Sequence, residues 1–546
     1  MFKTSVQDIL FVAQRVHRFD QHYLKLKVDV PLIHIIKETS KFGENVLYPL
    51  YHLSDKVGCR FDKGYVQTPP GFKAAYKTYK DGGWQGIALP EKYGGSGLPL
   101  SSHIIKSEIL ATSNWAWSMY PGLAFGAAQT LLAHGNEKLK EKYIPELCSG
   151  NWLGTMCLTE PQCGSDLNLI NTSATQIKDD IYSINGTKIF ISCGNHDFTD
   201  NILHCVLART ENTTKGTKGL SLFAVPKSDN VTTIRIEDKM GCHGSSTCEL
   251  VFDNAKGQLI GELNKGLNHM FTFINTSRIG TAIQGLSAAD LSFQLSLDYA
   301  KNRLSMRSLS GVKHPEKVAD PIIVHPDVQR MLMTQRVFAM GARSMIYECA
   351  LLADVNNVDK LEYLTPILKG FITECGIEAA NLGIQIYGGH GYISDNPVEQ
   401  ILRDVRIASL YEGTTGIQSL DLLGRKVLLN KLKPVDDMFK ESMKLCWDLR
   451  ANKHAREMMK HLIKWYMYTY KIGYQVKKTR DYDIVGSVSY HYLMYSGYII
   501  MGLHWLKMSN VSTDPEIQDL CNFYYNYILP RIYSHQIPIE KLHSIF

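Results

Sequence analysis

The stretch Ile407-Ala-Ser-Leu-Tyr-Glu-Gly-Thr-Thr-Gly-Ile-Gln418 joins an apolar run to a single carboxylate and then to a helix start. Gly413 frees the backbone to turn, and Thr414 and Thr415 are residue types that cap helices, which predicts a helix beginning there. Burial raises the pKa of a carboxyl group unless a cation compensates, so Glu412 suits a general base that removes a weakly acidic proton. Acids also favour helix N-termini, so this stretch alone leaves a capping role for Glu412 equally open.

Length and composition bound the protein class. The 546 residues exceed what one hydrophobic core usually serves, which predicts several domains. Hydrophobic residues at 45% and charged residues at 21% are typical of a globular protein, and the formal net charge of +6 gives no reason to expect nucleic-acid binding. Twelve cysteines without Cys-x-x-Cys spacing indicate neither a metal site nor disulfides, which favours free thiols in a reducing cytoplasm.

Residues 484–506 are uncharged over a span long enough to cross a bilayer. They also include two histidines, three serines, four tyrosines and three glycines, so the sequence predicts a buried helix and no membrane span. We expect Gly486, Gly497 and Gly502 to allow close approach of neighbouring helices. The apolar run at residues 9–13 is too short for a secretory signal.

The period of the apolar residues changes along the chain, which predicts an α+β multidomain fold. The expected parts are an N-terminal arm (1–40), an N-terminal helical domain (41–152), a middle β-barrel domain (153–265), a C-terminal helical bundle (266–430) and an appended helical domain (431–546). Residues 5–15 have amphipathic spacing and are expected to lie across another domain or subunit.

Seven β-rich runs separated by turn residues predict a compact barrel or sandwich in the middle domain, at residues 152–158, 173–178, 182–191, 202–208, 220–225, 232–236 and 249–252. Within the third run, Asn185-Gly186 is a strong signal for a two-residue hairpin. Residues 111–132 predict an apolar helix region. Its aromatic stripe, including Trp117 and Tyr120, is either core or the wall of an apolar ligand cavity.

Four segments carry residues suited to chemistry. Met156-Cys-Leu-Thr-Glu-Pro-Gln-Cys-Gly-Ser-Asp166 offers hydroxyls and backbone N–H groups that can bind a planar heterocycle and a phosphate. Lys188-Ile-Phe-Ile-Ser-Cys-Gly-Asn195 delivers an aromatic ring and a hydroxyl, and Gln385-Ile-Tyr-Gly-Gly-His-Gly-Tyr392 allows close backbone approach to a ligand. The fourth segment contains Glu412.

In this order, within helical, β and helical regions, the four segments closely resemble the acyl-CoA dehydrogenase family. The resemblance covers about residues 81–427 and rests on the Thr-Glu-Pro, Gly-Gly-His-Gly-Tyr and Tyr-Glu-Gly-Thr signatures. The arm and the additional C-terminal helices resemble the larger bacterial branch, whose members act on medium and long acyl chains and, in one case, on a sulfur-containing short acyl-CoA.

The resemblance implies an FAD cofactor and a homodimer or higher homo-oligomer. It implies cofactor contacts from Cys157, Leu158, Thr159, Gly164, Ser165, Phe190, Ile191, Ser192, Arg303, Gln385, Gly388, Gly389, Thr414 and Gly416. It implies acyl-CoA contacts from Ser165, Asn275, Arg278 and Gly413. An electron-transferring flavoprotein is the expected electron acceptor.

The sequence departs from the family pattern at several positions. Asn275 replaces a common aspartate, Phe190 replaces a common tryptophan, and Met306-Arg307 stands where a Phe-Gly pair is frequent. Some relatives carry the base one residue before Arg278, where this chain has Ser277, so Glu412 is the one candidate base.

By this resemblance, Glu412 takes the α-proton of an acyl-CoA thioester while the β-hydrogen moves as hydride to flavin N5. The product is a trans-2-enoyl-CoA, which implies a role in fatty-acid β-oxidation. The thioester oxygen is stabilised by the N–H of Glu412 and a ribityl hydroxyl. Two alternatives stay open: a DNA-associated flavoprotein of this fold, with residues 431–480 as its basic surface, and an oxygen-using acyl-CoA oxidase.

Overall fold

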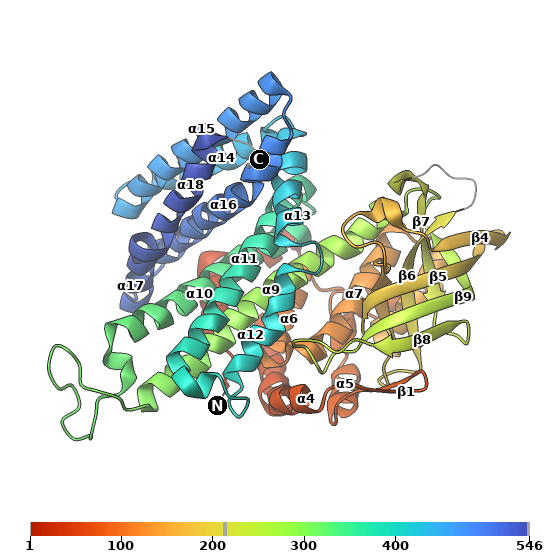
Figure 1. The fold of residues 1–546 in the computed structure, drawn as a ribbon, viewed down its shortest axis with the longest axis horizontal. Coiled ribbons are helices and arrows are strands. Elements are labelled where there is room, and N and C mark those ends of the chain that lie inside the picture. The colour runs from red at the N-terminus through yellow and green to blue at the C-terminus, as the bar shows by residue number, and fades with distance from the viewer. Residues whose placement is uncertain (1, 211–215, 543–546) are drawn as a thin grey trace. The chain divides into compact units, whose positions relative to one another are not determined.

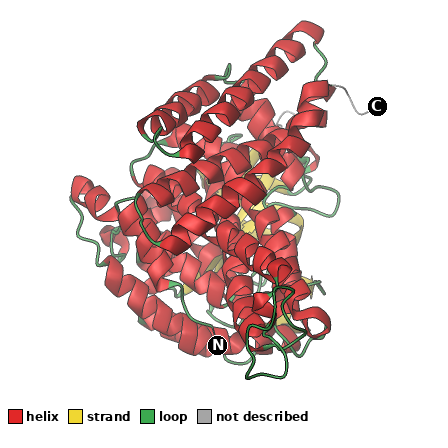
Figure 2. Ribbon diagram, turned by 90° about the vertical axis from the view of Figure 1, so that its left-hand side faces the viewer, coloured by secondary structure: helices red, strands yellow, loops and turns green. Residues whose placement is uncertain are grey.

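A computed structural model describes residues 2–210 and 216–542, which are mostly helical (Figures 1 and 2). Contacts divide the chain into two compact units. We call Val30–Gly280 the barrel unit and Met1–Asp29 with Thr281–Phe546 the bundle unit. Each is described by itself.

The barrel unit begins with helices packed around one aromatic-rich core. These helices are α3 (Leu32–Phe42), α4 (Tyr51–Val57), α5 (Phe72–Asp81), α6 (Leu100–Ser113), α7 (Trp115–His134) and α8 (Glu137–Ser149). A small hairpin, β1 (Arg60–Asp62) with β2 (Tyr65–Gln67), interrupts them. Its two-residue turn, Lys63-Gly64, adopts positive φ at both positions, the geometry that suits the twist of paired strands. This hairpin lies outside the predicted β-rich runs.

The expected helix over residues 111–132 is instead two helices. The break lies at Asn114, whose backbone is extended and whose side chain accepts a hydrogen bond from the N–H of Trp117 at 3.1 Å. Asn114 therefore ends α6 and caps α7, because asparagine competes with the helical backbone for hydrogen bonds.

Seven strands form the sheet of the barrel unit. They are β3 (Trp152–Cys157), β4 (Ser173–Lys178), β5 (Ile181–Ser192), β6 (Asn201–Thr210), β7 (Leu220–Pro226), β8 (Val231–Ile236) and β9 (Thr247–Ile260). The pairings β6–β4–β5–β9–β7–β6 close a ring, with β3 added to β6 and β8 added to β9. Apolar side chains such as Ile184, Val206 and Phe223 fill its interior. The predicted barrel and its seven strands are confirmed.

The predicted hairpin at Asn185-Gly186 is wrong. Both residues lie inside β5, where the pairing with β9 shifts register between Ile184 and Gly186. A Cβ at Gly186 would lie 2.5 Å from Thr172 Oγ1, so the glycine permits a close backbone approach at a bulge.

Helix α9 (Gly266–Asn302) gives its first residues to the barrel unit and its remainder to the bundle unit. The bundle unit continues with α10 (Pro326–Asp354), α11 (Val358–Tyr387), α12 (Val398–Arg406), α13 (Thr415–Leu420) and the π-helix η11 (Asp421–Leu428). The long helices carry buried apolar residues along much of their length, as expected for a bundle.

The N-terminal arm packs on this bundle. It forms α1 (Val6–Leu10), the π-helix η1 (Phe11–Val16) and α2 (Phe19–Leu26). Ser5 Oγ donates to Asp290 Oδ2 at 2.9 Å, and Arg336 Nη2 donates to Asp8 Oδ1 at 2.9 Å. Residues 5–15, which were expected to lie across another domain or subunit, thus pack on bundle helices of their own compact unit.

The appended segment is helical, as predicted. It contains α14 (Lys433–Asp448), α15 (Lys453–Thr479), α16 (Asp483–Asn510), α17 (Pro515–Phe523) and α18 (Ile532–Lys541), with the π-helix η12 (Tyr524–Ile528) and the 3₁₀ turn η13 (Leu529–Arg531) between the last two.

Helix α16 is mostly buried within the bundle unit, which confirms the prediction for residues 484–506. A Cβ at Gly497 would clash with Phe371, and one at Gly502 would clash with Met458, so both glycines permit close packing. Gly486 is exposed and a Cβ there would meet nothing within 4 Å, so that part of the prediction is wrong. Among the described helices, none is long and apolar enough to cross a membrane.

Candidate active site

Glu412 lies in a sharp turn between the 3₁₀ turn η10 (Ile407–Ser409) and α13. Its backbone is left-handed, with φ of 57°, and Gly413 follows with φ of 88°. A non-glycine residue in this region carries a local conformational cost, which persists only where surrounding contacts impose it. Thr414 Oγ1 accepts from the N–H of Ile417 at 3.2 Å, so the predicted helix cap is confirmed.

Two buried side chains hold this turn. Gln418 Nε2 donates to the Glu412 carbonyl at 2.9 Å, and Lys369 Nζ donates to the Gly413 carbonyl at 2.6 Å. Both side chains are fully buried. They anchor the turn to α13 and α11, and so fix the direction in which the Glu412 carboxylate leaves the backbone.

Neither Lys369 nor Gln418 was among the predicted site residues. Lys369 stands between apolar stretches of α11, where a buried cation needs a nearby acceptor. A single lysine among apolar residues therefore indicates a buried hydrogen-bond donor. The sequence does not show that its acceptor is a carbonyl forty-four residues later.

The neighbours of Glu412 are also fixed by side chains. Tyr411 Oη donates to Gln284 Oε1 at 2.5 Å, and Gln284 Nε2 donates to the Asp404 carbonyl at 2.8 Å. Thr415 Oγ1 donates to Glu374 Oε1 at 2.6 Å. Glu412 itself is half-buried, so its carboxylate occupies a held turn at the border between the packed interior and accessible space.

The barrel unit holds the first group of predicted flavin residues at the ends of β3 and β5. Phe190 is 58% exposed and has φ of 57°, where the β5–β9 register shifts and turns its ring outward. Gly164 and Ser165 are exposed, and a Cβ on Gly164 would meet nothing within 4 Å. An exposed aromatic ring, a hydroxyl and an open glycine fit a planar heterocycle with polar edges.

Two predicted contacts cannot come from side chains. Cys157 and Ile191 are buried in the barrel interior, so only their backbone groups face outward. Leu158 and Thr159 are half-buried, and their carbonyls already accept from Lys188 Nζ and the Ile189 N–H. Ser192, also half-buried, ends β5.

A buried ion pair fixes the loop that carries these residues. Lys188 Nζ donates to Glu160 Oε1 at 2.8 Å, and both side chains are almost fully buried. The N–H groups of Asn171 and Thr172 also donate to the Glu160 carboxylate. Burial alone would raise the pKa of Glu160, but the Lys188 ammonium and these donors outweigh it and lower the pKa to about 2.

The bundle unit holds the second group of predicted flavin residues. Arg303, Gln385, Gly388, Gly389 and Gly416 are exposed, and Thr414 is half-buried. A Cβ at Gly388 or Gly389 would meet nothing within 4 Å, which leaves the backbone there open to a ligand.

The predicted acyl-CoA contacts divide between the two units. Ser165, Asn275 and Arg278 belong to the barrel unit, the last two on α9. Gly413 belongs to the bundle unit. Arg278 is 6% exposed, and its guanidinium lies 5.9 Å from the ring centre of Phe271.

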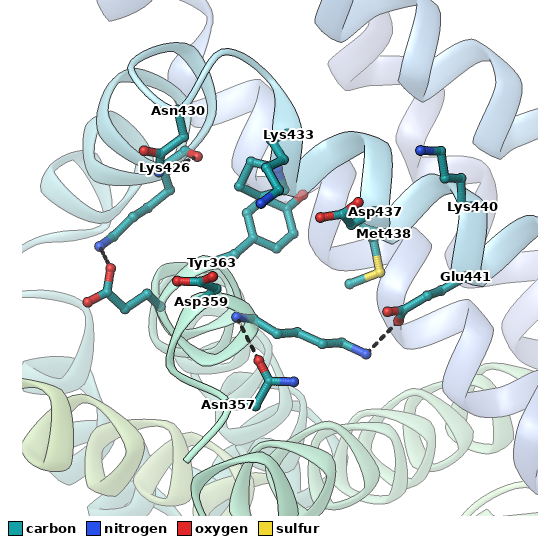
Figure 3. Close-up of a pocket in the computed structure, with 13 residues that line it drawn as sticks. Asn357, Asp359, Tyr363, Lys426, Asn430, Lys433, Asp437, Met438, Lys440 and Glu441 are labelled. Atoms are coloured by element: carbon teal, nitrogen blue, oxygen red, sulfur yellow. Dashed lines mark hydrogen bonds and ion pairs between the residues drawn. The ribbon is translucent and has the colours of Figure 1, made fainter. Parts of the chain in front are cut away.

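A separate cavity of about 590 Å³ opens between the start of α11, η11 and α14 (Figure 3). None of the predicted flavin or acyl-CoA residues lines it. Four lysines and four carboxylates line it, and two of these pairs, Lys426–Glu362 and Lys360–Glu441, are ion pairs. The cavity therefore offers no excess charge for a phosphorylated ligand.

No group of metal-ligating side chains occurs in residues 2–210 and 216–542. All twelve cysteines lie within these ranges and are free thiols, as the sequence analysis expected.

Comparison with known proteins identifies the family. Sequence profiles described as acyl-CoA dehydrogenase N-terminal, middle and C-terminal domains match residues 35–151, 155–255 and 264–428. A fourth, described as acetyl-CoA dehydrogenase C-terminal like, matches residues 437–544. The 3-methylmercaptopropionyl-CoA dehydrogenase of Ruegeria pomeroyi is 37% identical over 78% of this chain and 76% of its own length. The chain belongs to the acyl-CoA dehydrogenase family.

Further members of the acyl-CoA dehydrogenase family are similar over comparable lengths. The broad-specificity linear acyl-CoA dehydrogenase of Mycobacterium tuberculosis is 33% identical over 79% of this chain and 76% of its own. The structure of butyryl-CoA dehydrogenase from Megasphaera elsdenii matches with a TM-score of 0.63 and 27% identity, over 73% of this chain and 98% of that one.

The appended helices also have a structural counterpart. The structure of Caenorhabditis elegans ACDH-11 matches 95% of this chain and 91% of its own, with a TM-score of 0.77. At 19% identity this likeness concerns the fold alone.

The protein is therefore an FAD-dependent oxidoreductase of a family that catalyses acyl-CoA dehydrogenation. The predicted family, fold, enzyme class and cofactor are confirmed.

Proposed function

We propose that this enzyme converts an unbranched acyl-CoA thioester into the trans-2-enoyl-CoA, with Glu412 as the base that removes the α-proton. The observation that carries the proposal is the held turn at Glu412. A carboxylate on a strained turn, fixed by Gln418 and Lys369, is positioned before substrate arrives.

In this reaction the α-carbon loses a proton to the Glu412 carboxylate, and the electron pair of that C–H bond forms the new double bond. The β-carbon loses hydrogen with its electron pair, and FAD supplies the two-electron acceptor for it. We assign the Glu412 N–H as a donor to the thioester oxygen, where negative charge develops as the α-proton leaves.

Flavin binding is proposed for the backbone of residues 157–159, for Gly164, Ser165, Phe190 and Ser192 of the barrel unit, and for Arg303, Gln385, Gly388, Gly389, Thr414 and Gly416 of the bundle unit. The exposed ring of Phe190 and the open glycines support this assignment. Ser165, Asn275 and Arg278 are proposed to bind the CoA portion, since a buried arginine suits a phosphorylated ligand.

The proposed substrate is a linear acyl-CoA, supported by the broad-specificity linear enzyme and the 3-methylmercaptopropionyl-CoA enzyme among the relatives. A homodimer and an electron-transferring flavoprotein as acceptor complete the proposal. A similar structure comes from work on the electron transferring flavoprotein of Acidaminococcus fermentans, at 27% identity and a TM-score of 0.63. A panel of straight-chain acyl-CoAs with 3-methylmercaptopropionyl-CoA, assayed with that acceptor and with oxygen, tests substrate and acceptor together.

The structure revises which residues of α7 are expected to influence chain length. Trp117 and Tyr120 are fully buried in the aromatic core, with Trp117 Nε1 donating to the Phe72 carbonyl at 3.2 Å. Met119 and Leu123, on another face of α7, pack against the same core but are only partly buried. The cavity-lining role is therefore proposed for these two residues.

Met119→Ala is expected to change the order of preference in the acyl-CoA panel with little loss of stability. Trp117→Ala is expected to lower the free energy of unfolding by about 3–5 kcal/mol while leaving that order unchanged. Urea unfolding beside the substrate panel measures both. The proposal would be contradicted if Trp117→Ala changed the order of substrate preference while Met119→Ala kept the wild-type order. The acyl cavity would then be lined by the core-facing residues.

A further inference from the structure

Helix α15 presents an exposed face that is both basic and apolar. Its 27 residues include seven lysine or arginine side chains and one glutamate. It lies beside α14 and packs on α16, with α18 also in contact (Figure 1). The opposite side of α15 faces solvent along a length of about 40 Å.

Four large apolar side chains form a line along this face. Ile463, Met467, Tyr470 and Tyr474 recur at spacings of three or four residues, so they lie on one side of the helix. All four are exposed, Met467 at 62% and Tyr474 at 66%. Other residues of α15, such as Leu462 and Trp465, are the ones that are buried.

Cations flank this apolar line on the same face. They are Arg456, Lys460, Lys464, Lys471, Lys477 and Lys478. Lys460, Lys464 and Lys477 form no ion pair with any residue in the described ranges. Of the acids on adjacent helices, Asp436 accepts from Tyr466 and Tyr470, and Glu540 accepts from Tyr468, so neither pairs with these three lysines.

We propose that this face of α15 docks on an anionic phospholipid surface. Lysine stems reach past apolar side chains and place their ammonium groups at the level of lipid phosphates. The apolar line between them then enters the boundary between headgroups and acyl chains, with tyrosines at that boundary.

Charge alone would also suit duplex DNA, but the arrangement favours lipid. DNA phosphates attract lysines and offer no apolar surface along the backbone, so Ile463 and Met467 would stay exposed in that complex. A lipid surface satisfies both the cations and the apolar line. The docking is peripheral, since α15 is amphipathic and stays packed on α16.

The first test uses the full-length protein with FAD bound and sedimentation with vesicles. Wild type is expected to sediment with vesicles of equal parts phosphatidylglycerol and phosphatidylcholine, and to remain in solution with phosphatidylcholine alone. The triple variant Lys460→Gln/Lys464→Gln/Lys477→Gln is expected to bind the anionic vesicles about 100-fold more weakly, since each lysine near such a surface contributes about fivefold. Turnover of a dissolved acyl-CoA should stay unchanged.

A matched control removes the same charge elsewhere. Lys25, Lys73 and Lys317 are exposed and lie outside α15, so the triple change of these residues to Gln should keep wild-type vesicle binding. Equal losses in the two triple variants would show a net-charge effect and overturn the assignment to α15.

A third variant tests the apolar line. Ile463→Ser/Met467→Ser/Tyr474→Ser keeps every cation and should weaken vesicle binding by at least about tenfold. Wild-type vesicle binding by this variant would overturn the proposal. So would failure of wild type to bind anionic vesicles, tighter binding to duplex DNA through the same lysines, or a dimer in gel filtration that the serine changes dissociate.

Discussion

Glu412→Gln is expected to abolish useful turnover while leaving the folded flavoprotein intact. Glutamine has almost the shape of glutamate and cannot accept the α-proton, so turnover should fall by at least roughly 10²–10⁴-fold. The contacts that hold the turn come from the backbone carbonyls of residues 412 and 413, and they survive the change. The protein should therefore purify with its yellow cofactor and still bind acyl-CoA, which calorimetry measures.

Two further variants sharpen this result. Glu412→Asp keeps a carboxylate but withdraws it by one methylene, so its turnover should lie between those of wild type and Glu412→Gln. Glu399→Gln is the matched control, because Glu399 is paired with Arg403 on α12 and is not assigned to the reaction. It should turn over at nearly the wild-type rate. A comparable loss in Glu399→Gln would mean that charge in this region, and not the base, controls activity.

Lys188→Met is expected to lower the free energy of unfolding by about 3–5 kcal/mol. It leaves the Glu160 carboxylate buried without its cation, although the N–H groups of Asn171 and Thr172 remain. The loop that carries the first group of flavin residues should loosen, so the variant should also retain less flavin. Urea unfolding and the ratio of flavin to protein after gel filtration measure the two effects.

The pH dependence distinguishes this pair from simple loss of packing. In wild type the lowered pKa of Glu160 contributes stability above its unfolded pKa, near 4.5, and that contribution is lost as pH falls toward about 2. Without Lys188, burial should raise the pKa of Glu160, so protonation relieves the penalty at acidic pH. The stability gap between Lys188→Met and wild type should therefore narrow as pH falls from neutral toward 4. Adding Glu160→Gln should recover part of the loss, and a gap that is constant with pH would contradict the account.

Much of the fold follows from local sequence patterns, because each strand of the middle domain is a short β-rich run between turn residues. The failures come from tertiary context. Asn185-Gly186 has the composition of a hairpin turn, yet pairing with β9 continues through it as a bulge. Asn114 breaks an apolar helix because its side chain caps the next one, a choice that periodicity alone does not reveal.

The sequence predicts those residues of the candidate site whose side chains can transfer a proton or cap a helix. Glu412 and its capping threonine stand out in the sequence. The contacts that give Glu412 its position do not, since Lys369 and Gln418 act on backbone carbonyls that any sequence would supply. The role of Glu160 also depends on Lys188, which is distant in the chain and becomes its partner only when β5 forms.

The most direct test of the central claim is anaerobic mixing of acyl-CoA with the oxidised enzyme, followed by the loss of flavin absorbance in a single turnover. This measurement excludes product release and the electron acceptor, so it reports the chemical step alone. Wild type and Glu399→Gln should bleach rapidly, whereas Glu412→Gln, saturated with the same substrate, should keep its oxidised spectrum. Bleaching of Glu412→Gln at a rate near that of wild type would show that another group removes the α-proton and would contradict the account.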